Sequence, residues 1–516
     1  MFRRSRRDAG LTGALEAFLP QTADMLRQVL ADCQREFAYD SLRLRKKLLA
    51  ELADLLVDFA EDLHAGLGLW RAYERYNTEI FGTPLPLTER SCPGQMKGIH
   101  IDRVRHLLWM LYPQVEPGLI LSPTHQDMER AADAMQRFLS DAFRSLPRES
   151  GAKAFIQSAN RWGWDVKRKL VWLGTESYML RLLHTAYLKR HNRGTSDIAC
   201  TDDFVCQEWT RWSGLGALDL LAGMLDISED ERRDLRSWYE RHASFYRIVA
   251  VSDDTVDAVN VVCDRPYRIR MNMPEHPFRV GQMVFGSLVP WCGEWYWSGL
   301  QQKWDDADAM DVDGIRDTMK RQNSHVLCRF WPDYHAKVLD MAADIHERMM
   351  AFYGRDLIIY PDGLSMAADW QKEMRHNWES RPHEAIEETI RRHGLKNRRP
   401  DMTIPKDLLD SKGGIAVYIN PDEGKEIMDG FNAIVEGLRH KGRDLTHDQM
   451  CAIRGFIESD AVSPRFVHRV VAEYGDESIK DAYLLGEDAP AYWLEYLLRR
   501  HKGHYYRKRY PSVSVV

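Results

Sequence analysis

Short runs of β-branched and aromatic residues, separated by turn residues, occupy the middle of the chain between residues 245 and 304. In the third run, Tyr, Ile and Met alternate with Arg, Arg and Asn, so one face is apolar and the other is polar. Five short strands spaced about ten residues apart are typical of a small closed or nearly closed antiparallel barrel. The predicted strands are 245–251, 256–263, 267–273, 282–289 and 294–297.

Before these strands, apolar residues recur every three to four positions, which is the spacing of one helix face. The clearest stripe runs from Leu48 to Leu63, in a helix expected to begin near Ser41. Ser122-Pro123 predicts the start of another helix, and Ser228 with Glu231 predicts a capping box for the last one. We therefore expect a helical domain over residues 1–240, followed by the β-barrel-like module over residues 241–304.

Helical spacing returns in residues 305–516, where one pattern occurs twice. A short apolar run, 357–360 or 415–419, is followed by a Pro-Asp turn and an expected helix. We predict that the two runs pair with each other, and neither turn carries the GxGxxG of a dinucleotide site. The fold class is thus predicted to be α+β and predominantly helical, with a central five-stranded antiparallel barrel-like module and a small two-stranded element near the C-terminal end.

The composition is that of a globular chain, since 44% of the 516 residues are hydrophobic and 29% are charged. No apolar run approaches the ~18 residues of a membrane span, so no membrane partner is expected. The opening MFRRSRRDAG lacks the apolar segment of a signal peptide, and the eight cysteines form no CxxC pair. These features predict a cytoplasmic protein. The net charge of −6 argues against a surface that is basic throughout but allows local basic patches.

The barrel-like module carries the first candidate binding surface. Arg268 and Arg270 alternate along its third strand, while Trp295 and Trp297 share one face of the fifth. If these side chains point outward, they form a stacking platform for nucleic acid. Over about a dozen residues, the segment FRVGQMVFGSLVP resembles the glycine-turned strand entry common in oligonucleotide-binding barrels. If the aromatic side chains point inward, they join the barrel to the helical regions, and packing is the interpretation that we favour.

Two further segments combine aromatic and basic residues. In residues 161–183, tryptophans and basic residues could bind bases and phosphates, but a helix-packing core accounts for them better. The C-terminal tail is the second segment, and it is predicted either to bind a polyanion or to be an exposed, solvated end. In the first case, truncation after Leu498 should weaken nucleic-acid binding with little effect on stability. The competing outcome is that Tyr505 and Tyr506 are buried against the helical domain, so that truncation lowers the melting temperature and leaves nucleic-acid affinity unchanged. The candidate contacts in the tail are Arg499, Arg500, Lys502, Tyr505, Tyr506, Arg507, Lys508 and Arg509.

One motif suggests metal chemistry. On a helix, His383 and Glu387 share a face, so a divalent metal could lie between them, with His393 as a further ligand and Glu384 as general base. The zincin motif, however, requires histidine where Glu387 stands. A solvated helix with pairs such as Glu387 and Arg391 is the better interpretation.

Two functions are therefore expected from the sequence. The first is a non-catalytic, multidomain intracellular binding or scaffold protein, which binds nucleic acid or partner proteins through the barrel and the basic tail and needs no cofactor. The alternative is a metal-dependent hydrolase that uses the His383-to-His393 helix, in which case a divalent metal is the cofactor. The sequence contains no P-loop, nucleophile elbow or kinase motif.

Overall fold

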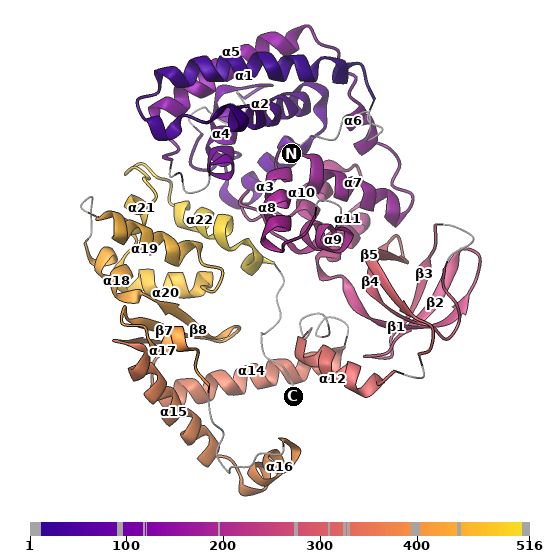
Figure 1. The fold of residues 1–516 in the computed structure, drawn as a ribbon, viewed down its shortest axis with the longest axis vertical. Coiled ribbons are helices and arrows are strands. Elements are labelled where there is room, and N and C mark those ends of the chain that lie inside the picture. Colours follow the sequence, from indigo (N-terminus) through magenta and orange to yellow (C-terminus); the bar gives the residue numbers. More distant parts are fainter. Residues whose placement is uncertain are drawn as a thin grey trace. The chain divides into compact units, whose positions relative to one another are not determined.

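The computed structural model shows two compact units (Figure 1). Unit 1 consists of Met1–Arg316 and Glu487–His504, so both ends of the chain contribute to it. Unit 2 consists of Asp317–Gly486 and Tyr505–Val516. The residues that the structure describes are 12–89, 96–116, 119, 121–194, 197–272, 277–307, 310–322, 327, 331–393, 403–440 and 445–507.

Unit 1 is built mainly from helices around one large apolar core. The stripe beginning at Leu48 lies on α2, whose Leu52, Leu55 and Phe59 are fully buried. Packing of such stripes, rather than helix propensity, is the main source of stability for helices of this length. The helices are α1 (Leu19–Cys33), α2 (Lys46–Glu61), α3 (Leu69–Phe81), α4 (Ile101–Val115), α5 (Gln126–Arg144), α6 (Gly151–Ile156), α7 (Gly163–Glu176), α8 (Arg181–Arg190), α9 (Ile198–Gln207), α10 (Ala217–Met224), α11 (Glu229–Ser237) and α22 (Trp493–Lys502).

The helix boundaries were only partly predictable from the sequence. The capping box of Ser228 and Glu231 is present at the start of α11, as predicted. The start predicted at Ser122-Pro123 is wrong, because α5 begins at Gln126. His125 is the N-cap of this helix, and its ring accepts a hydrogen bond from the Asp127 amide at 3.1 Å.

The central strands form a closed barrel in the order β1-β2-β3-β5-β4, which confirms the predicted barrel. Neighbouring strands are antiparallel except for β3 and β5, which pair in parallel with Ile269 opposite Trp295. The barrel interior is filled by apolar side chains such as Tyr246, Val256 and Leu288. The strands are β1 (His242–Val251), β2 (Thr255–Asn260), β3 (Pro266–Arg270), β4 (Met283–Trp291) and β5 (Glu294–Trp304).

One outer face of the barrel packs against the helices of unit 1. Trp291 and Tyr296 point away from the barrel interior and belong to the helical core. The ring of Tyr296 approaches α7 so closely that a Cβ on Gly163 would lie 2.6 Å from it. Glycine at this position therefore permits the contact between α7 and β5.

Unit 2 contains a three-stranded antiparallel sheet in the order β6-β7-β8, formed by β6 (Leu357–Tyr360), β7 (Ile415–Asn420) and β8 (Gly424–Asp429). The predicted pairing of the two apolar runs is confirmed, with Leu357 opposite Tyr418. The third strand was not predicted, because a helix was expected directly after the second Pro-Asp turn. The Pro421-Asp422 turn instead closes a hairpin, with Gly424 in the left-handed region at φ +74°.

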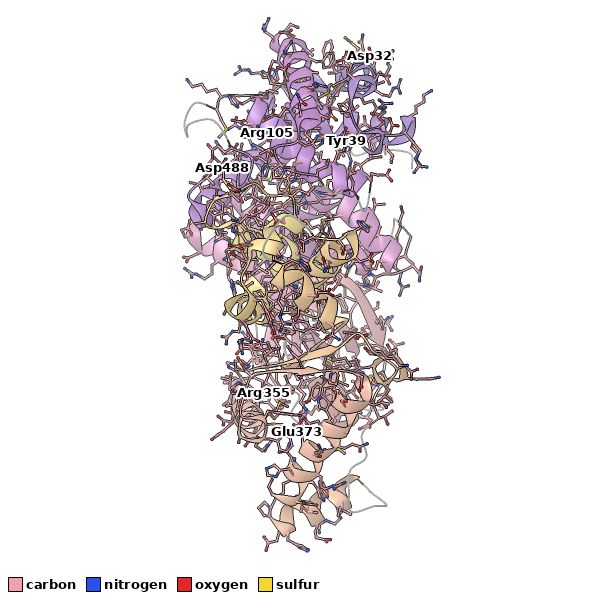
Figure 2. All side chains as sticks on the ribbon, turned by 90° about the vertical axis from the view of Figure 1, so that its left-hand side faces the viewer. Asp32, Tyr39, Arg105, Arg355, Glu373 and Asp488 are labelled. Atoms are coloured by element: carbon pink, nitrogen blue, oxygen red, sulfur yellow. The ribbon has the colours of Figure 1, made fainter. Side chains whose placement is uncertain are left out.

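Helices lie against both faces of this sheet. On one face, the buried carboxylate of Glu373, labelled in Figure 2, accepts a hydrogen bond from the Tyr353 hydroxyl at 2.7 Å. On the other face, Phe466 of α20 stacks on Tyr418 at 5.1 Å between ring centroids. The helices are α14 (Pro332–Tyr353), α15 (Gly363–Glu379), α16 (His383–His393), α17 (Lys406–Leu409), α18 (Phe431–Arg439), α19 (His447–Glu458), α20 (Pro464–Tyr474) and α21 (Glu477–Ala482), while α12 (Val312–Gln322) spans the boundary between the units.

None of the helices in the described part of the chain combines the length and the apolar character that crossing a membrane requires.

Candidate functional site

The basic C-terminal segment is largely built into unit 1. Arg500 is 7% exposed and Lys502 is fully buried, both on α22. The Arg500 guanidinium lies over the Trp109 ring, 4.4 Å from its centroid. Arg500 and Lys502 were expected to be exposed to a polyanion. This expectation is wrong, because α22 is packed and both side chains are buried. Arg499 pairs with Glu495 at 2.9 Å.

The residues that follow α22 are also engaged or lie outside the described range. The Tyr505 hydroxyl donates a hydrogen bond to the Asp460 carbonyl at 3.1 Å. Tyr506 and Arg507 are half-buried, and Lys508 and Arg509 lie outside the described residues.

The barrel tryptophans point toward the barrel interior, which supports the packing interpretation. Trp295 lies edge-on to Tyr267 at 4.8 Å, and Trp297 stacks on Phe278 at 5.6 Å. Neither Arg268 nor Arg270 lies over these rings, and each has carboxylate partners. The Arg268 Nε lies 3.2 Å from an Asp257 carboxylate oxygen, and the Arg270 Nε lies 3.5 Å from one of Glu294. These four residues therefore do not form the outward stacking platform.

The aromatic segment of residues 161–183 packs in the same way. Trp162 and Trp164 stack at 5.4 Å between ring centroids, and Trp164 contacts Tyr296 of the barrel. Lys169 is 1% exposed and donates to the Asn160 side-chain oxygen at 2.6 Å. Burial lowers the pKa of Lys169 to about 8. The favoured core interpretation fits this segment.

The motif on α16 lies on an exposed helix. The His383 Nε2 is 3.9 Å from a carboxylate oxygen of Glu387, and both side chains are exposed. Glu384 is exposed as well, and the side chain of His393 lies outside the described residues. Within the described ranges, no three His, Cys, Asp or Glu side chains are grouped closely enough to hold a metal ion. The two placed ligands do not by themselves fit a metal centre, since structural and catalytic zinc sites use at least three protein ligands.

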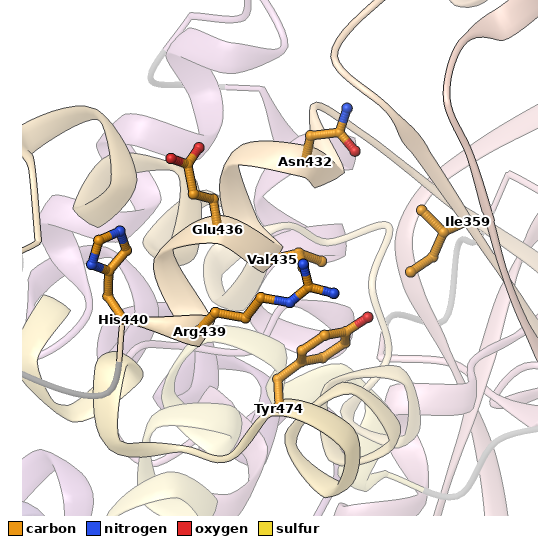
Figure 3. A pocket seen from close by; sticks show the side chains of 7 residues that line it. All are labelled: Ile359, Asn432, Val435, Glu436, Arg439, His440 and Tyr474. Atoms are coloured by element: carbon orange, nitrogen blue, oxygen red, sulfur yellow. The ribbon is translucent and has the colours of Figure 1, made fainter.

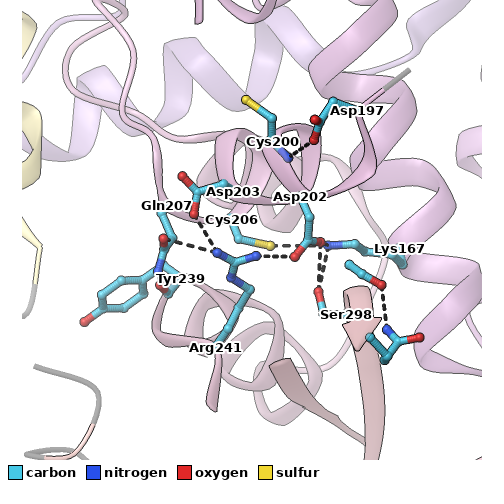
Figure 4. Close-up of polar contacts among 12 residues, drawn as sticks. Lys167, Asp197, Cys200, Asp202, Asp203, Cys206, Gln207, Tyr239, Arg241 and Ser298 are labelled. Atoms are coloured by element: carbon cyan, nitrogen blue, oxygen red, sulfur yellow. Dashed lines mark hydrogen bonds and ion pairs between the residues drawn. The ribbon is translucent and has the colours of Figure 1, made fainter. Parts of the chain in front are cut away.

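Unit 1 contains a buried ionic centre between its helices and the barrel (Figure 4). Lys167 of α7 and Arg241, which precedes β1, both pair with the Asp202 carboxylate of α9. The Ser298 hydroxyl of β5 donates to the same carboxylate at 2.9 Å. Arg241 also pairs with Asp203 at 2.7 Å.

This ionic centre fixes the barrel to the helices. Burial by itself raises the pKa of Asp202, but the charges of Lys167 and Arg241 outweigh it and lower that pKa. Asp202 therefore stays ionised at neutral pH. A Cβ on Gly299, whose φ is +71°, would lie 2.7 Å from an Asp202 carboxylate oxygen. The tight packing around paired charges is that of a structural junction.

Unit 2 contains an open groove with a volume of about 480 Å³ (Figure 3). One helix supplies most of it, because positions 432, 435, 436 and 439 recur along one face of α18. Ile359 of β6 and Tyr474 at the end of α20 line the remaining sides, and Figure 3 shows Arg439 pointing toward Tyr474. The lining residues are Ile359, Asn432, Val435, Glu436, Arg439, His440 and Tyr474.

The groove lies beside the open edge of the sheet. The Ile419 amide donates to the Asp356 carbonyl at 2.8 Å, and these two residues stand opposite each other in the register. In an antiparallel pair, hydrogen-bonded and non-hydrogen-bonded positions alternate. Ile358 and Tyr360 therefore direct their backbone groups toward β7, while Leu357 and Ile359 direct theirs outward. No described residue hydrogen-bonds to the outward groups.

This site was not predicted from the sequence. A helix after the second apolar run was expected, but its groove-facing positions were not singled out, and the residues that complete the groove are far away in the chain. Ile359 lies more than seventy positions before α18, and Tyr474 lies in a different helix. Only the fold brings them together.

One protein family, described as protein of unknown function (DUF3843), matches residues 27–198, about a third of the chain. The match lies in the helical part of unit 1 and contains none of the groove residues. Neither the curated proteins nor the solved structures contain a match to this chain.

Proposed function

We propose that the chain is a non-catalytic binding protein that holds an extended segment of another polypeptide against strand β6. Of the two kinds of partner expected for a binding protein, another protein is favoured over nucleic acid. The cations expected at a nucleic-acid surface are buried or paired with carboxylates, as described above for Arg500, Lys502 and Arg268.

The observation that carries the proposal is the open edge of β6. An extended peptide adds to such an edge through main-chain hydrogen bonds, and adjacent pockets select its side chains. The outward amide and carbonyl groups of Leu357 and Ile359 provide the first requirement. The groove between β6 and α18 provides the second.

The exposed side chain of Ile359 also supports peptide binding at the edge of β6. It is 36% exposed, although it lies in a short strand whose other residues are buried. Exposed edge strands are usually protected by charged residues, proline or a bulge, because an unprotected edge pairs with other chains. β6, with the sequence LIIY, is short but contains no charged residue, proline or bulge.

The rest of the molecule is consistent with binding in a reducing compartment. The six cysteines in the described part of the chain are free thiols. We infer a cytoplasmic location from this cysteine usage, as expected from the sequence.

The test uses one position with two substitutions. Ile359→Pro removes the outward amide but no hydrogen bond to β7, since the Ile359 backbone faces away from that strand. Ile359→Thr keeps the amide and is the matched control. The probe is a set of linear peptides selected on the full-length protein from a displayed random library.

The expected result is a loss of affinity of about tenfold or more for Ile359→Pro, because each lost main-chain hydrogen bond contributes about 0.5–1.5 kcal/mol and the proline ring also blocks approach. Ile359→Thr should retain most of the affinity, and both variants should melt close to the unmodified protein. The proposal is wrong if no peptide is recovered, or if the folded proline variant binds as well as the threonine variant.

A further inference from the structure

Arg439 differs from the arginines of the neighbouring helices α19 and α20 in having no described carboxylate partner. On α19, Arg454 pairs with Glu458 at 3.0 Å. On α20, Arg465 pairs with Asp422 at 3.2 Å, and Arg469 pairs with Asp356 at 2.9 Å. No carboxylate in the described ranges forms an ion pair with Arg439, and its side chain is exposed in the groove.

The Arg439 guanidinium is nevertheless held in a defined place. It lies over the Tyr474 ring, 5.6 Å from the centroid. Stacking on an aromatic face leaves the edge of the planar guanidinium available, and this edge carries the paired N–H donors that match a carboxylate. An arginine oriented in this way loses less side-chain entropy on binding than a mobile one.

The neighbouring side chains indicate what lies next to that carboxylate. Ile359 and Val435 give the groove an apolar wall between the strand and the helix. Glu436 is exposed one turn before Arg439 and disfavours a ligand with a run of several acidic residues.

A second exposed cation flanks the strand itself. Arg355, labelled in Figure 2, precedes β6 by two positions and forms no ion pair with a described carboxylate. With Arg439 in the groove, the surroundings of β6 therefore complement negative rather than positive charge in a ligand.

We propose that the groove beside β6 selects polypeptide segments that carry a single carboxylate, bound by Arg439, next to an apolar side chain that contacts Ile359 and Val435. This inference rests on the proposed function and specifies its ligand. The carboxylate is either an Asp or Glu side chain or the C-terminal carboxylate of the ligand, because both present the same two oxygen atoms to the guanidinium.

The test compares matched peptides on matched proteins. A peptide selected on the full-length protein is prepared in three forms: with its acid, with that acid replaced by the corresponding amide, and with an amidated C-terminus. Affinities are measured by fluorescence anisotropy for the unmodified protein, for Arg439→Gln and for Arg465→Gln. The last variant is the control, because Arg465 lies in the same unit with a carboxylate partner and is not part of the groove lining.

The expected result is that amide replacement weakens binding to the unmodified protein and to Arg465→Gln by about tenfold. In Arg439→Gln the acid and amide forms should bind equally, as a double-mutant cycle requires for two groups that interact directly. Whichever of the two amide forms loses affinity identifies the source of the carboxylate.

Two failures can be distinguished. If peptides are recovered and lose affinity in Ile359→Pro, but acid and amide forms bind the unmodified protein equally, the carboxylate inference is wrong and strand addition stands. The proposed function and this inference are both wrong if Ile359→Pro leaves the affinity of the recovered peptides unchanged. They are also both wrong if a single-stranded oligonucleotide displaces the peptides from the unmodified protein but not from Arg439→Gln.

Discussion

The ionic centre of unit 1 and the groove of unit 2 each contain an arginine, but the surroundings of the two arginines are opposite. In the ionic centre, Arg241 is enclosed, and Asp202 and Asp203 both pair with it. In the groove, Arg439 is exposed and only the Tyr474 ring holds it. A buried charge must be paired, because an unpaired one costs several kcal/mol. An exposed charge without a partner costs little and remains available to a ligand.

The helix α22 extends the same contrast to the end of the chain. Its basic residues suggested a solvated tail, but the helix also carries Trp493, Tyr496, Leu497 and Leu498, which are buried. The apolar stripe determines where the helix lies, and Arg500 and Lys502 are carried into the interior with it. Local charge in a sequence therefore does not distinguish a binding surface from a packed helix.

The largest expected effect comes from removing α22. Truncation after Gly486 deletes four large buried side chains, and each loss of this kind costs about 2–5 kcal/mol. The sum is comparable to the total stability of a domain, about 5–15 kcal/mol. Unit 1 should therefore fail to fold, as measured by circular dichroism and by soluble yield.

The matched control for the truncation is Arg499→Ala in the full chain. This substitution breaks a partly buried pair with Glu495 and should change stability by less than about 1 kcal/mol. A truncated protein that melts at the same temperature as the full chain would show that α22 is a peripheral tail after all.

A smaller effect is expected from breaking the ionic centre. Asp202→Asn leaves Lys167 and Arg241 buried without their shared carboxylate and should lower the free energy of unfolding by about 3–5 kcal/mol. Asp203→Asn removes a carboxylate that is 38% exposed, and it should cost no more than about 1 kcal/mol. Urea unfolding measures the free energy of unfolding of both variants. Equal losses would contradict the claim that the buried carboxylate of Asp202 matters more than the exposed one of Asp203.

The contribution of Asp202 to stability should also depend on pH. Because the folded-state pKa of Asp202 is lowered, its ionisation stabilises the fold above its unfolded-state pKa of about 3.9. That stabilisation is lost as the pH falls through the lowered folded-state value. The stability difference between the unmodified protein and Asp202→Asn should thus be constant near neutral pH and shrink below about pH 4. A difference that already declines near neutral pH would contradict this assignment.

The smallest effect on stability is expected in the groove. Arg439→Gln removes a stacking contact at an exposed site, which is worth about 0.5–1 kcal/mol. The melting temperature should change only slightly, whereas binding of acidic peptides should fall. A large loss of stability would show that Arg439 has a structural role like that of Arg241, which would contradict the comparison.

The sequence predicted features that depend on local patterns. The barrel strands, the capping box at Ser228 and the pairing of β6 with β7 each follow from periodicity or turn chemistry within a short segment. The strand β8 was not predicted, because Ile427 and the following apolar residues have both strand and helix spacing over so short a stretch. In the structure, left-handed Gly424 lies in the hairpin turn, and left-handed Gly430 separates β8 from α18.

The functional site depends on contacts between distant segments, and periodicity carries no information about these. Arg439 and Arg500 are both basic residues on amphipathic helices, and nothing within either helix reveals which one is covered. Arg500 is buried because Trp109, almost four hundred positions earlier, lies beneath it. Arg439 is exposed because β6 is an edge strand, a property that belongs to the sheet and not to the residue.

The most direct measurement of the central claim is amide hydrogen exchange along β6, with and without a selected peptide. In the free protein, the amides of Leu357 and Ile359 should exchange quickly, while those of Ile358 and Tyr360, which face β7, should be protected. Bound peptide should protect the Leu357 and Ile359 amides as well. Protection of these two amides in the free protein, or fast exchange that persists when the peptide is bound, would contradict the account.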